Sequence, residues 1–250
     1  MLRPLAAAFG FLTRIPIGRG AIEPRELGRA VAWFPAVGAA LGVAQLAGHR
    51  ALDGALGPGV IAVALVALHA GLTGGLHLDG VADVFDALGG GRGQRDRMLA
   101  IMRDSRIGAH GAVAVALVLA AKAAAIAELI DHSSGHRHGP GWALFAAPIA
   151  ARWAAVPLVV GFPYTRPDGL GRAFHDHAGA AQVLGATAIA ALAIGWIGAP
   201  VIAPALAAAA AALAIAVWLH RHLGGLTGDV YGAAIEAAEL AFLVAAGLRG

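Results

Sequence analysis

The chain has 250 residues, of which 59% are hydrophobic and only 13% are charged, and its mean hydropathy is +0.73. Soluble domains carry about 25% charged residues, so this composition excludes an ordinary soluble protein and indicates a helical membrane protein. Cysteine is absent, which excludes disulfides, thiolate metal sites and cysteine nucleophiles. The pI near 10.2 reflects an excess of arginine. The arginines form no patch interleaved with aromatic residues, so we expect them to report membrane topology and no nucleic-acid partner.

In chain order, the apolar runs begin with a short N-terminal segment. Residues 5–12 resemble the core of a signal peptide, but Arg14 and Pro16 follow it without a small-residue cleavage pattern. We therefore expect a retained segment that is interfacial or re-entrant.

Seven longer apolar runs follow, each near the roughly 20 residues that a membrane-crossing helix needs. They cover residues 31–48, 58–74, 108–130, 141–162, 179–198, 200–219 and 231–248. The sequence therefore predicts an all-α, polytopic membrane bundle that forms a single integral membrane domain over residues 1–250. It leaves the oligomeric state open, including a homo-oligomer.

If these spans alternate, the segments 1–30, 75–107, 163–178 and 220–230 lie on one side of the bilayer. That side holds thirteen arginines, and the other side holds Arg50, Arg137 and Arg249. The positive-inside rule makes the arginine-rich side cytoplasmic. We therefore expect the protein in the bacterial cytoplasmic (inner) membrane, with one composite site facing the cytoplasm.

The arginine-rich side also carries a cluster of acids at Asp79, Asp83 and Asp86. On a helix, with about 100° per residue, these positions project from one stripe roughly 60° wide. Carboxylates three and four residues apart repel each other, and oxygen-rich clusters of this kind bind hard divalent cations. The cluster predicts a Mg²⁺ site. A solvated acidic face is the alternative.

Two acids lie within the last predicted span, Glu236 and Glu239, on one helical face. Carboxylates at membrane depth usually face a cavity or a partner. With Asp229 they supply a second ligand set or hold an arginine, and structural pairing with Arg152 or Lys122 is the alternative. The stretch 164–177, which includes Arg166, lies on the arginine-rich side and either contacts substrate or forms a polar loop.

Three separated motifs resemble the cobalamin synthase family, the adenosylcobinamide-GDP ribazoletransferases. The central motif is His77-Leu78-Asp79-Gly80-Val81-Ala82-Asp83 with Asp86, followed by Ile101-Met102-Arg103-Asp104-Ser105-Arg106-Ile107-Gly108. The N-terminal motif is Phe11-Leu12-Thr13-Arg14-Ile15-Pro16. The C-terminal motif is Gly225-Leu226-Thr227-Gly228-Asp229 with Gly232, Ala233, Glu236 and Glu239. The resemblance thus extends over most of the chain.

The resemblance implies that the 3′-hydroxyl of α-ribazole, or of its 5′-phosphate, displaces GMP from adenosylcobinamide-GDP. Such a reaction needs metal-assisted neutralisation of the diphosphate. The residues expected to carry it fall into three groups. The metal ligands are Asp79, Asp83 and Asp86; the catalytic candidates are Asp104, Glu236 and His77; the substrate-binding candidates are Arg14, Arg103, Arg106, Asp229 and Glu239. The choice of general base among Asp104, Glu236 and the rest of the acidic cluster stays open.

Two other functions fit parts of the sequence. The string from Asp79 to Asp83 partly resembles the DGxxAR portion of CDP-alcohol phosphotransferases, which act on lipid head groups, but it has Asp83 where that motif has Ala. A secondary transporter would use the charges inside the spans, Lys122, Arg152, Glu236 and Glu239, along a path through the membrane. No phosphate-binding loop of the GxxxxGK[ST] type occurs, which argues against a nucleotide-hydrolysing domain.

Overall fold

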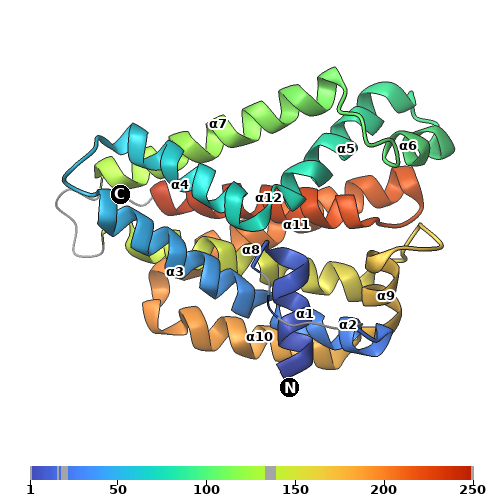
Figure 1. The fold of residues 1–250 in the computed structure, drawn as a ribbon, viewed down its shortest axis with the longest axis horizontal. Helices are drawn as coiled ribbons and strands as arrows, with labels where there is room; N and C mark the ends of the chain where they lie inside the picture. Colours follow the sequence, from blue (N-terminus) through green and yellow to red (C-terminus); the bar gives the residue numbers. More distant parts are fainter. Residues whose placement is uncertain (1, 16, 18–21, 133–138, 249–250) are drawn as a thin grey trace.

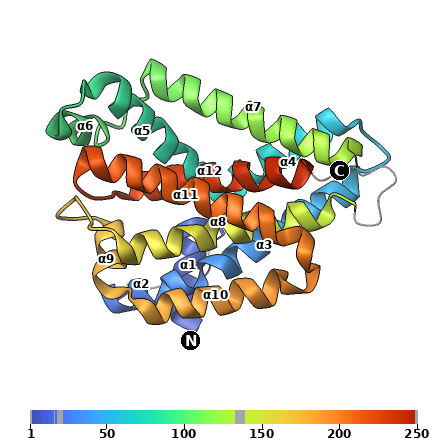
Figure 2. The same ribbon diagram turned by 180° about the vertical axis from the view of Figure 1, so that it is seen from behind.

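The computed structural model describes residues 2–15, 17, 22–132 and 139–248, and these residues form helices joined by short turns (Figures 1 and 2). Pro16 of the N-terminal motif, and Arg19, Arg137 and Arg249 of the arginine count, lie outside the described residues. The long helices are α3 (Phe34–Leu52), α7 (Ala109–His132), α8 (Gly141–Gly161), α10 (Ala180–Ile194), α11 (Ile202–Leu223) and α12 (Gly228–Gly247). The shorter helices are α1 (Leu2–Leu12), α2 (Pro24–Ala30), α4 (Pro58–Thr73), α5 (Leu76–Gly91), α6 (Arg95–Ile101) and α9 (Leu170–His177). Three 3₁₀ turns, η1 (Val31–Trp33), η2 (Gly195–Ile197) and η3 (Ala199–Val201), continue neighbouring helices.

Within these described ranges, six helical segments are long and apolar enough to cross a membrane, and a bent pair of helices makes up to seven. The six are Pro24–Leu52, Ala109–Asp131, Gly141–Gly161, Ala180–Ile197, Ala199–Leu223 and Gly228–Gly247. The prediction of an all-α, membrane-spanning bundle is therefore confirmed. The first segment begins earlier than predicted because Pro24 stands in the first helical turn and the Glu26 carboxylate accepts the Glu23 N–H at 3.3 Å.

The second predicted span, 58–74, corresponds to α4, which is the first arm of the bent pair and is short. Helix α4 has only 16 residues, which gives about 24 Å of helix against a hydrocarbon core of about 30 Å. The chain then turns by 92° into α5. Gly74 and Gly75 make this turn with φ of 64° and 71°, a left-handed conformation that glycine adopts without strain. The Arg14 side chain lies over the turn, where a β-carbon on Gly74 would come within 2.1 Å of its Nε.

Helix α12 forms the centre of the bundle and packs against α5, α7, α8 and α11 (Figures 1 and 2). Its small residues allow close approach of other backbones, which is how helices pack tightly inside a bilayer. Gly80 of α5 lies against the first turn of α12, where a β-carbon would come within 2.6 Å of the Asp229 carbonyl oxygen. The acidic helix is therefore held directly against α12.

Helices α2, α5, α6 and α9 and the turn between α11 and α12 gather at one end of the bundle, at the right in Figure 1. The described C-terminal residues and the loop 53–57 lie at the other end (Figures 1 and 2). The segments 75–107, 163–178 and 220–230 therefore share one end, as the alternation of spans predicted; of the predicted segment 1–30, α2 lies toward this end and α1 does not (Figure 1). Helix α1 runs across the long helices instead of along them (Figure 1). It is an apolar helix of only 11 residues, too short to cross a bilayer by itself.

Candidate active site

Helix α5 carries the acidic cluster, and its bounds confirm the predicted helix. Asp79 is exposed and Asp83 is half-buried. The negative charges of Asp229 and Asp79 act on Asp83, and the positive charge of Arg166 acts against them. The carboxylate of Asp229, in the first turn of α12, therefore lies close enough to act together with the acids of α5.

Arg166 supplies the counter-charge at this junction. Its Nη2 donates to Asp229 Oδ2 at 2.5 Å and to the Met102 carbonyl oxygen at 3.0 Å. The Asp229 side chain also accepts from the Thr227 hydroxyl at 3.3 Å. One guanidinium thus ties the segment after α8 to α12 and to the end of α6. Sequence analysis named Arg166 only as part of a polar stretch, because its partners lie about sixty residues away on both sides.

Asp86, the third predicted metal ligand, has structural partners. Its Oδ2 accepts the Gly108 N–H at 2.6 Å and its Oδ1 accepts the Gly111 N–H at 2.8 Å. These N–H groups belong to the start of α7, where helix N–H groups lack partners within the helix and a negative charge is favourable. Asp86 therefore anchors the motif 101–108 to α5.

The donor chemistry of the junction fits Mg²⁺, which prefers carboxylate oxygens and water. Asp79, Asp83 and Asp229 supply such oxygens from two helices that are in contact. As the side chains of the described residues are oriented, no three His, Asp or Glu groups converge closely enough to hold an ion. The magnesium site stays a prediction.

Two cavities meet at Asp79. We call the first the tyrosine cavity; it has a volume of about 550 Å³ and is bordered by α1, α3, α5, α8, α9 and α12. Its polar lining consists of His77, Asp79, Arg103, Tyr164, Arg166, Asp168, Asp229 and Tyr231. The second, the glycine cavity, has a volume of about 580 Å³ and is lined by Gly10, Phe11, Thr13, Arg14, Thr73, Gly74, Gly75, Leu76, Leu78, Asp79, Ala82, Ile107 and Val115. Phe11, Leu76 and Asp79 belong to both cavities.

The structure divides the predicted arginines. Arg103 lines the tyrosine cavity and Arg14 lines the glycine cavity. Arg106 lines neither, and its Nη2 pairs with Asp104 Oδ2 at 2.6 Å on the surface. Hydrogen bonds from Arg106 lower the pKa of Asp104 to about 2, so this carboxylate is a weak acceptor for a proton near neutral pH.

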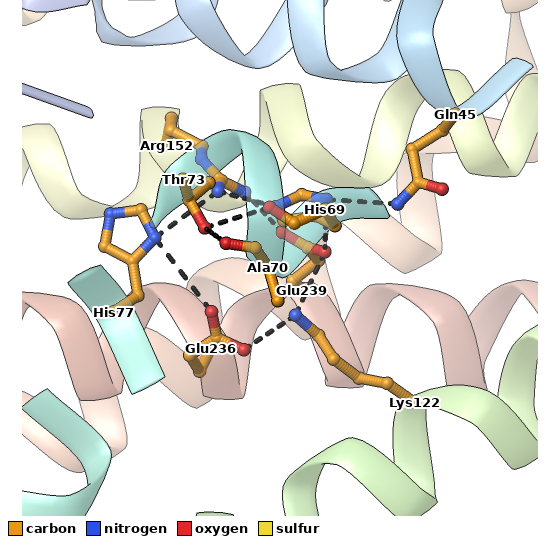
Figure 3. Close-up of polar contacts among 9 residues, drawn as sticks. All are labelled: Gln45, His69, Ala70, Thr73, His77, Lys122, Arg152, Glu236 and Glu239. Atoms are coloured by element: carbon orange, nitrogen blue, oxygen red, sulfur yellow. Dashed lines mark hydrogen bonds and ion pairs between the residues drawn. The ribbon is translucent and has the colours of Figure 1, made fainter. Parts of the chain in front are cut away.

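Glu236 and Glu239 lie inside the bundle in a buried charge network (Figure 3). Lys122 Nζ is 2.7 Å from Glu236 Oε2 and 3.0 Å from Glu239 Oε1. Arg152 Nη1 pairs with Glu239 Oε2. The two glutamates therefore form ion pairs inside the protein, which is one of the alternatives that the sequence left open. Both Lys122 and Arg152 take part in these pairs. Neither glutamate lines the tyrosine or the glycine cavity; they border a separate void of only about 20 Å³.

The tyrosine cavity contains groups that sequence analysis missed. Both tyrosines of the chain, Tyr164 and Tyr231, line it. The Tyr231 hydroxyl, Arg166 Nε and His77 Nε2 are buried and have no hydrogen-bond partner in the part of the chain that the structure describes. Buried polar groups are normally satisfied, so we expect water or a polar ligand to bond these three atoms. A tyrosine in an apolar run gives no sequence signal that separates this role from packing.

Comparisons with known proteins agree with this site. A family model described as cobalamin-5-phosphate synthase matches residues 4–247. A protein of Pseudomonas aeruginosa (strain UCBPP-PA14) named adenosylcobinamide-GDP ribazoletransferase is 41% identical, over 99% of this chain and 98% of its own length. Proteins of the same name from Pseudomonas paraeruginosa (strain DSM 24068 / PA7) and Geotalea daltonii are 42% and 40% identical, over 99% and 98% of this chain and 98% and 96% of their own lengths. No solved structure matches the chain significantly. The chain belongs to the cobalamin-5-phosphate synthase family.

Proposed function

We propose that the chain is a membrane-bound adenosylcobinamide-GDP ribazoletransferase. The observation that carries the proposal is its match, over 99% of its length, to relatives of that name. The reaction joins α-ribazole or its 5′-phosphate to adenosylcobinamide-GDP and gives adenosylcobalamin or its 5′-phosphate. The ribazole 3′-oxygen bonds to the phosphorus that carries the cobinamide, and the bond from that phosphorus to the bridging oxygen breaks. GMP leaves with the electron pair, and a base takes the hydroxyl proton.

Two cavities that share Asp79 support a reaction with two large substrates. In-line attack needs the nucleophile and the leaving group on opposite sides of phosphorus. Cavities of about 550 and 580 Å³ that share the Asp79 carboxylate in their linings would allow such an arrangement. We propose that the diphosphate lies at Asp79 and that one substrate occupies each cavity.

Magnesium is part of this proposal. Asp79 and Asp83, with Asp229 beside them, would hold the ion, and Asp86 would support the cluster from its contacts with the start of α7. Bound Mg²⁺ would supply positive charge to the diphosphate oxygens. Arg103 and Arg166 lie in the same cavity lining and bind the remaining oxygens through the planar fork that matches phosphate.

The general base belongs to the acidic cluster of α5 in this proposal. The two other candidates are already engaged, since Asp104 pairs with Arg106 and Glu236 pairs with Lys122. A base must lie within hydrogen-bond reach of the hydroxyl that it deprotonates. Asp79 lines both cavities, so we propose it as the group that would reach this hydroxyl.

One assay tests the proposed function against its closest rival. Purified protein in detergent receives adenosylcobinamide-GDP, α-ribazole or its 5′-phosphate, and Mg²⁺; we expect equal amounts of GMP and completed corrinoid. A CDP-activated lipid with an alcohol acceptor should give no CMP. Release of CMP from the lipid, without GMP from the corrinoid, would replace this proposal with a lipid phosphotransferase.

A further inference from the structure

Arg152 stands between the two arms of the broken helix pair. It is fully buried in α8, and its Nη2 lies 2.8 Å from His69 Nε2 of α4 and 3.4 Å from His77 Nδ1 of α5. Its Nη1 pairs with Glu239 of α12. Figure 3 shows the guanidinium at the centre of this set, with the histidine rings on opposite sides.

The hydrogen-bond chemistry of arginine sets the tautomer of His77. A guanidinium has N–H donors and no acceptor, so His77 Nδ1, which lies 3.4 Å from Nη2, must supply a lone pair. The contact of the same nitrogen with Glu236 Oε1 is longer, at 3.9 Å. A neutral imidazole carries its single hydrogen on the other nitrogen, so His77 carries its hydrogen on Nε2.

The network around these rings is balanced in charge. Lys122 and Arg152 supply two positive charges, and Glu236 and Glu239 supply two negative charges, all of them buried. Buried ions are tolerated when they are paired and hydrogen-bonded. With the rings neutral, the cluster has no net charge, as its location between apolar helices requires.

The free nitrogen of His77 belongs to a residue that lines the candidate active site. His77 lines the tyrosine cavity with Asp79 and Tyr231, and its Nε2 is buried and has no partner among the described residues. Figure 3 shows this nitrogen on the side of the ring that points away from the network. The network thus ends in one buried N–H on a residue of the cavity lining.

We propose that Arg152 is a positioning residue, which fixes His77 in the Nε2–H tautomer so that His77 donates a hydrogen bond to a substrate oxygen in the tyrosine cavity. The acceptor is a phosphoryl or hydroxyl oxygen. The identity of the substrate rests on the proposed function. The tautomer does not, because it follows from protein contacts alone.

The tautomer can be measured without substrate. The chain contains 11 histidines, so protein labelled with ¹⁵N-histidine is studied in detergent micelles, and a His77→Gln sample identifies the His77 signals. We expect a nitrogen shift typical of a lone pair for Nδ1 and of an N–H for Nε2. A hydrogen on Nδ1, or an equal mixture of the two tautomers, would overturn the proposal even if the ribazoletransferase activity is confirmed.

A charge-balanced variant tests the role of Arg152. Removing Arg152 alone would leave two buried carboxylates, Glu236 and Glu239, against the single cation Lys122, which is costly. Arg152→Gln is therefore combined with Glu239→Gln. We expect the folded double variant to show a mixture of His77 tautomers. Its turnover should be about ten- to hundredfold lower, which is the effect on rate of losing one hydrogen bond to a charged group. Arg50→Gln, an exposed arginine at the other end of the bundle, is the matched control and should change neither.

A second comparison separates positioning from mere stabilisation. His77→Gln places an amide N–H near the position of Nε2 without needing a tautomer, and should keep more turnover than His77→Phe. In the His77→Gln background, the Arg152 and Glu239 changes should add less than about a threefold loss, because coupled residues are not additive. An equal loss in both backgrounds would reduce Arg152 to a structural residue. If the double variant does not fold, the labelled wild-type protein still decides the tautomer.

Discussion

The backbone of Asp229 rests on Gly80, where a β-carbon would come within 2.6 Å of the Asp229 carbonyl oxygen. This contact sets the distance between the acidic face of α5 and the first turn of α12. Asp79, Asp83 and Asp229 therefore act as one group of charges because a residue without a side chain separates their helices.

Gly80→Ala should lower turnover by about a hundredfold, since a displacement near 1 Å at a reacting centre has an effect of that size. The added methyl group forces α5 away from α12 and moves Asp79 and Asp83 relative to Arg166. Steady-state assays on detergent-purified protein measure the effect. Gly71→Ala is the control, because a β-carbon there meets open space. Normal turnover in the Gly80 variant would show that the spacing of the helices does not matter to the reaction.

Asp79→Asn and Asp83→Asn should each lower turnover by orders of magnitude while the protein stays folded. The substitution keeps the size of the side chain and removes the charge that a metal or a developing charge needs. Wild-type protein should lose activity in a chelator and regain it with Mg²⁺. Activity that survives rigorous chelation would rule out the magnesium site.

Asp104→Asn should leave the acidic limb of the pH profile of kcat/KM in place. Hydrogen bonds from Arg106 lower the pKa of Asp104 to about 2, so this carboxylate is ionised throughout the range in which the enzyme is assayed. Its protonation therefore takes place below that range and does not shape the limb. Rates measured from pH 5 to 9 test this, and a shifted limb in the variant would restore Asp104 as the general base.

Arg166→Lys should raise KM for the diphosphate substrate about tenfold or more. Lysine keeps the charge but cannot reach Asp229 and the Met102 carbonyl oxygen with one planar group. Arg172→Lys is the matched control, since Arg172 pairs with Asp176 on the exposed side of α9. If both variants bind substrate as the wild type does, Arg166 has no part in recognition.

The sidedness of the site is tested with single cysteines, which this cysteine-free chain allows. Cysteine at Gln94 or Asp168 should be protected from an impermeant thiol reagent in intact cells, and cysteine at Ala55, in the loop at the other end of the bundle, should react. Inverted vesicles should reverse the pattern. Labelling of position 94 in intact cells would place the site outside.

The sequence predicted the spans well because a bilayer leaves few choices. Apolar segments of about 20 residues must satisfy their own backbone hydrogen bonds, so hydropathy alone located them to within a few residues. The positions of the acids on one face of α5 followed in the same way from helical periodicity. Both predictions rest on local rules.

The rest of the site depends on contacts that no local rule describes. Arg152 and Glu239 are 87 residues apart, and two cations of similar chemistry were available to each glutamate. Asp86 had the spacing of a metal ligand, yet its partners are two backbone N–H groups at the start of another helix. The tyrosine cavity exists only once six helices have packed together, so neither Tyr231 nor Arg166 stood out beforehand.

The glycine pair at positions 74 and 75 decides where the acids lie. Without the turn, α4 and α5 would form one straight helix about 50 Å long, and Asp86 would stand about 12 Å beyond a hydrocarbon core of about 30 Å, on a free helix end. The turn bends α5 away from that line by 92° and packs it against α12. In the proposed reaction, the diphosphate would therefore meet the acids beside the central helix of the bundle, with the charges of two helices acting on it together.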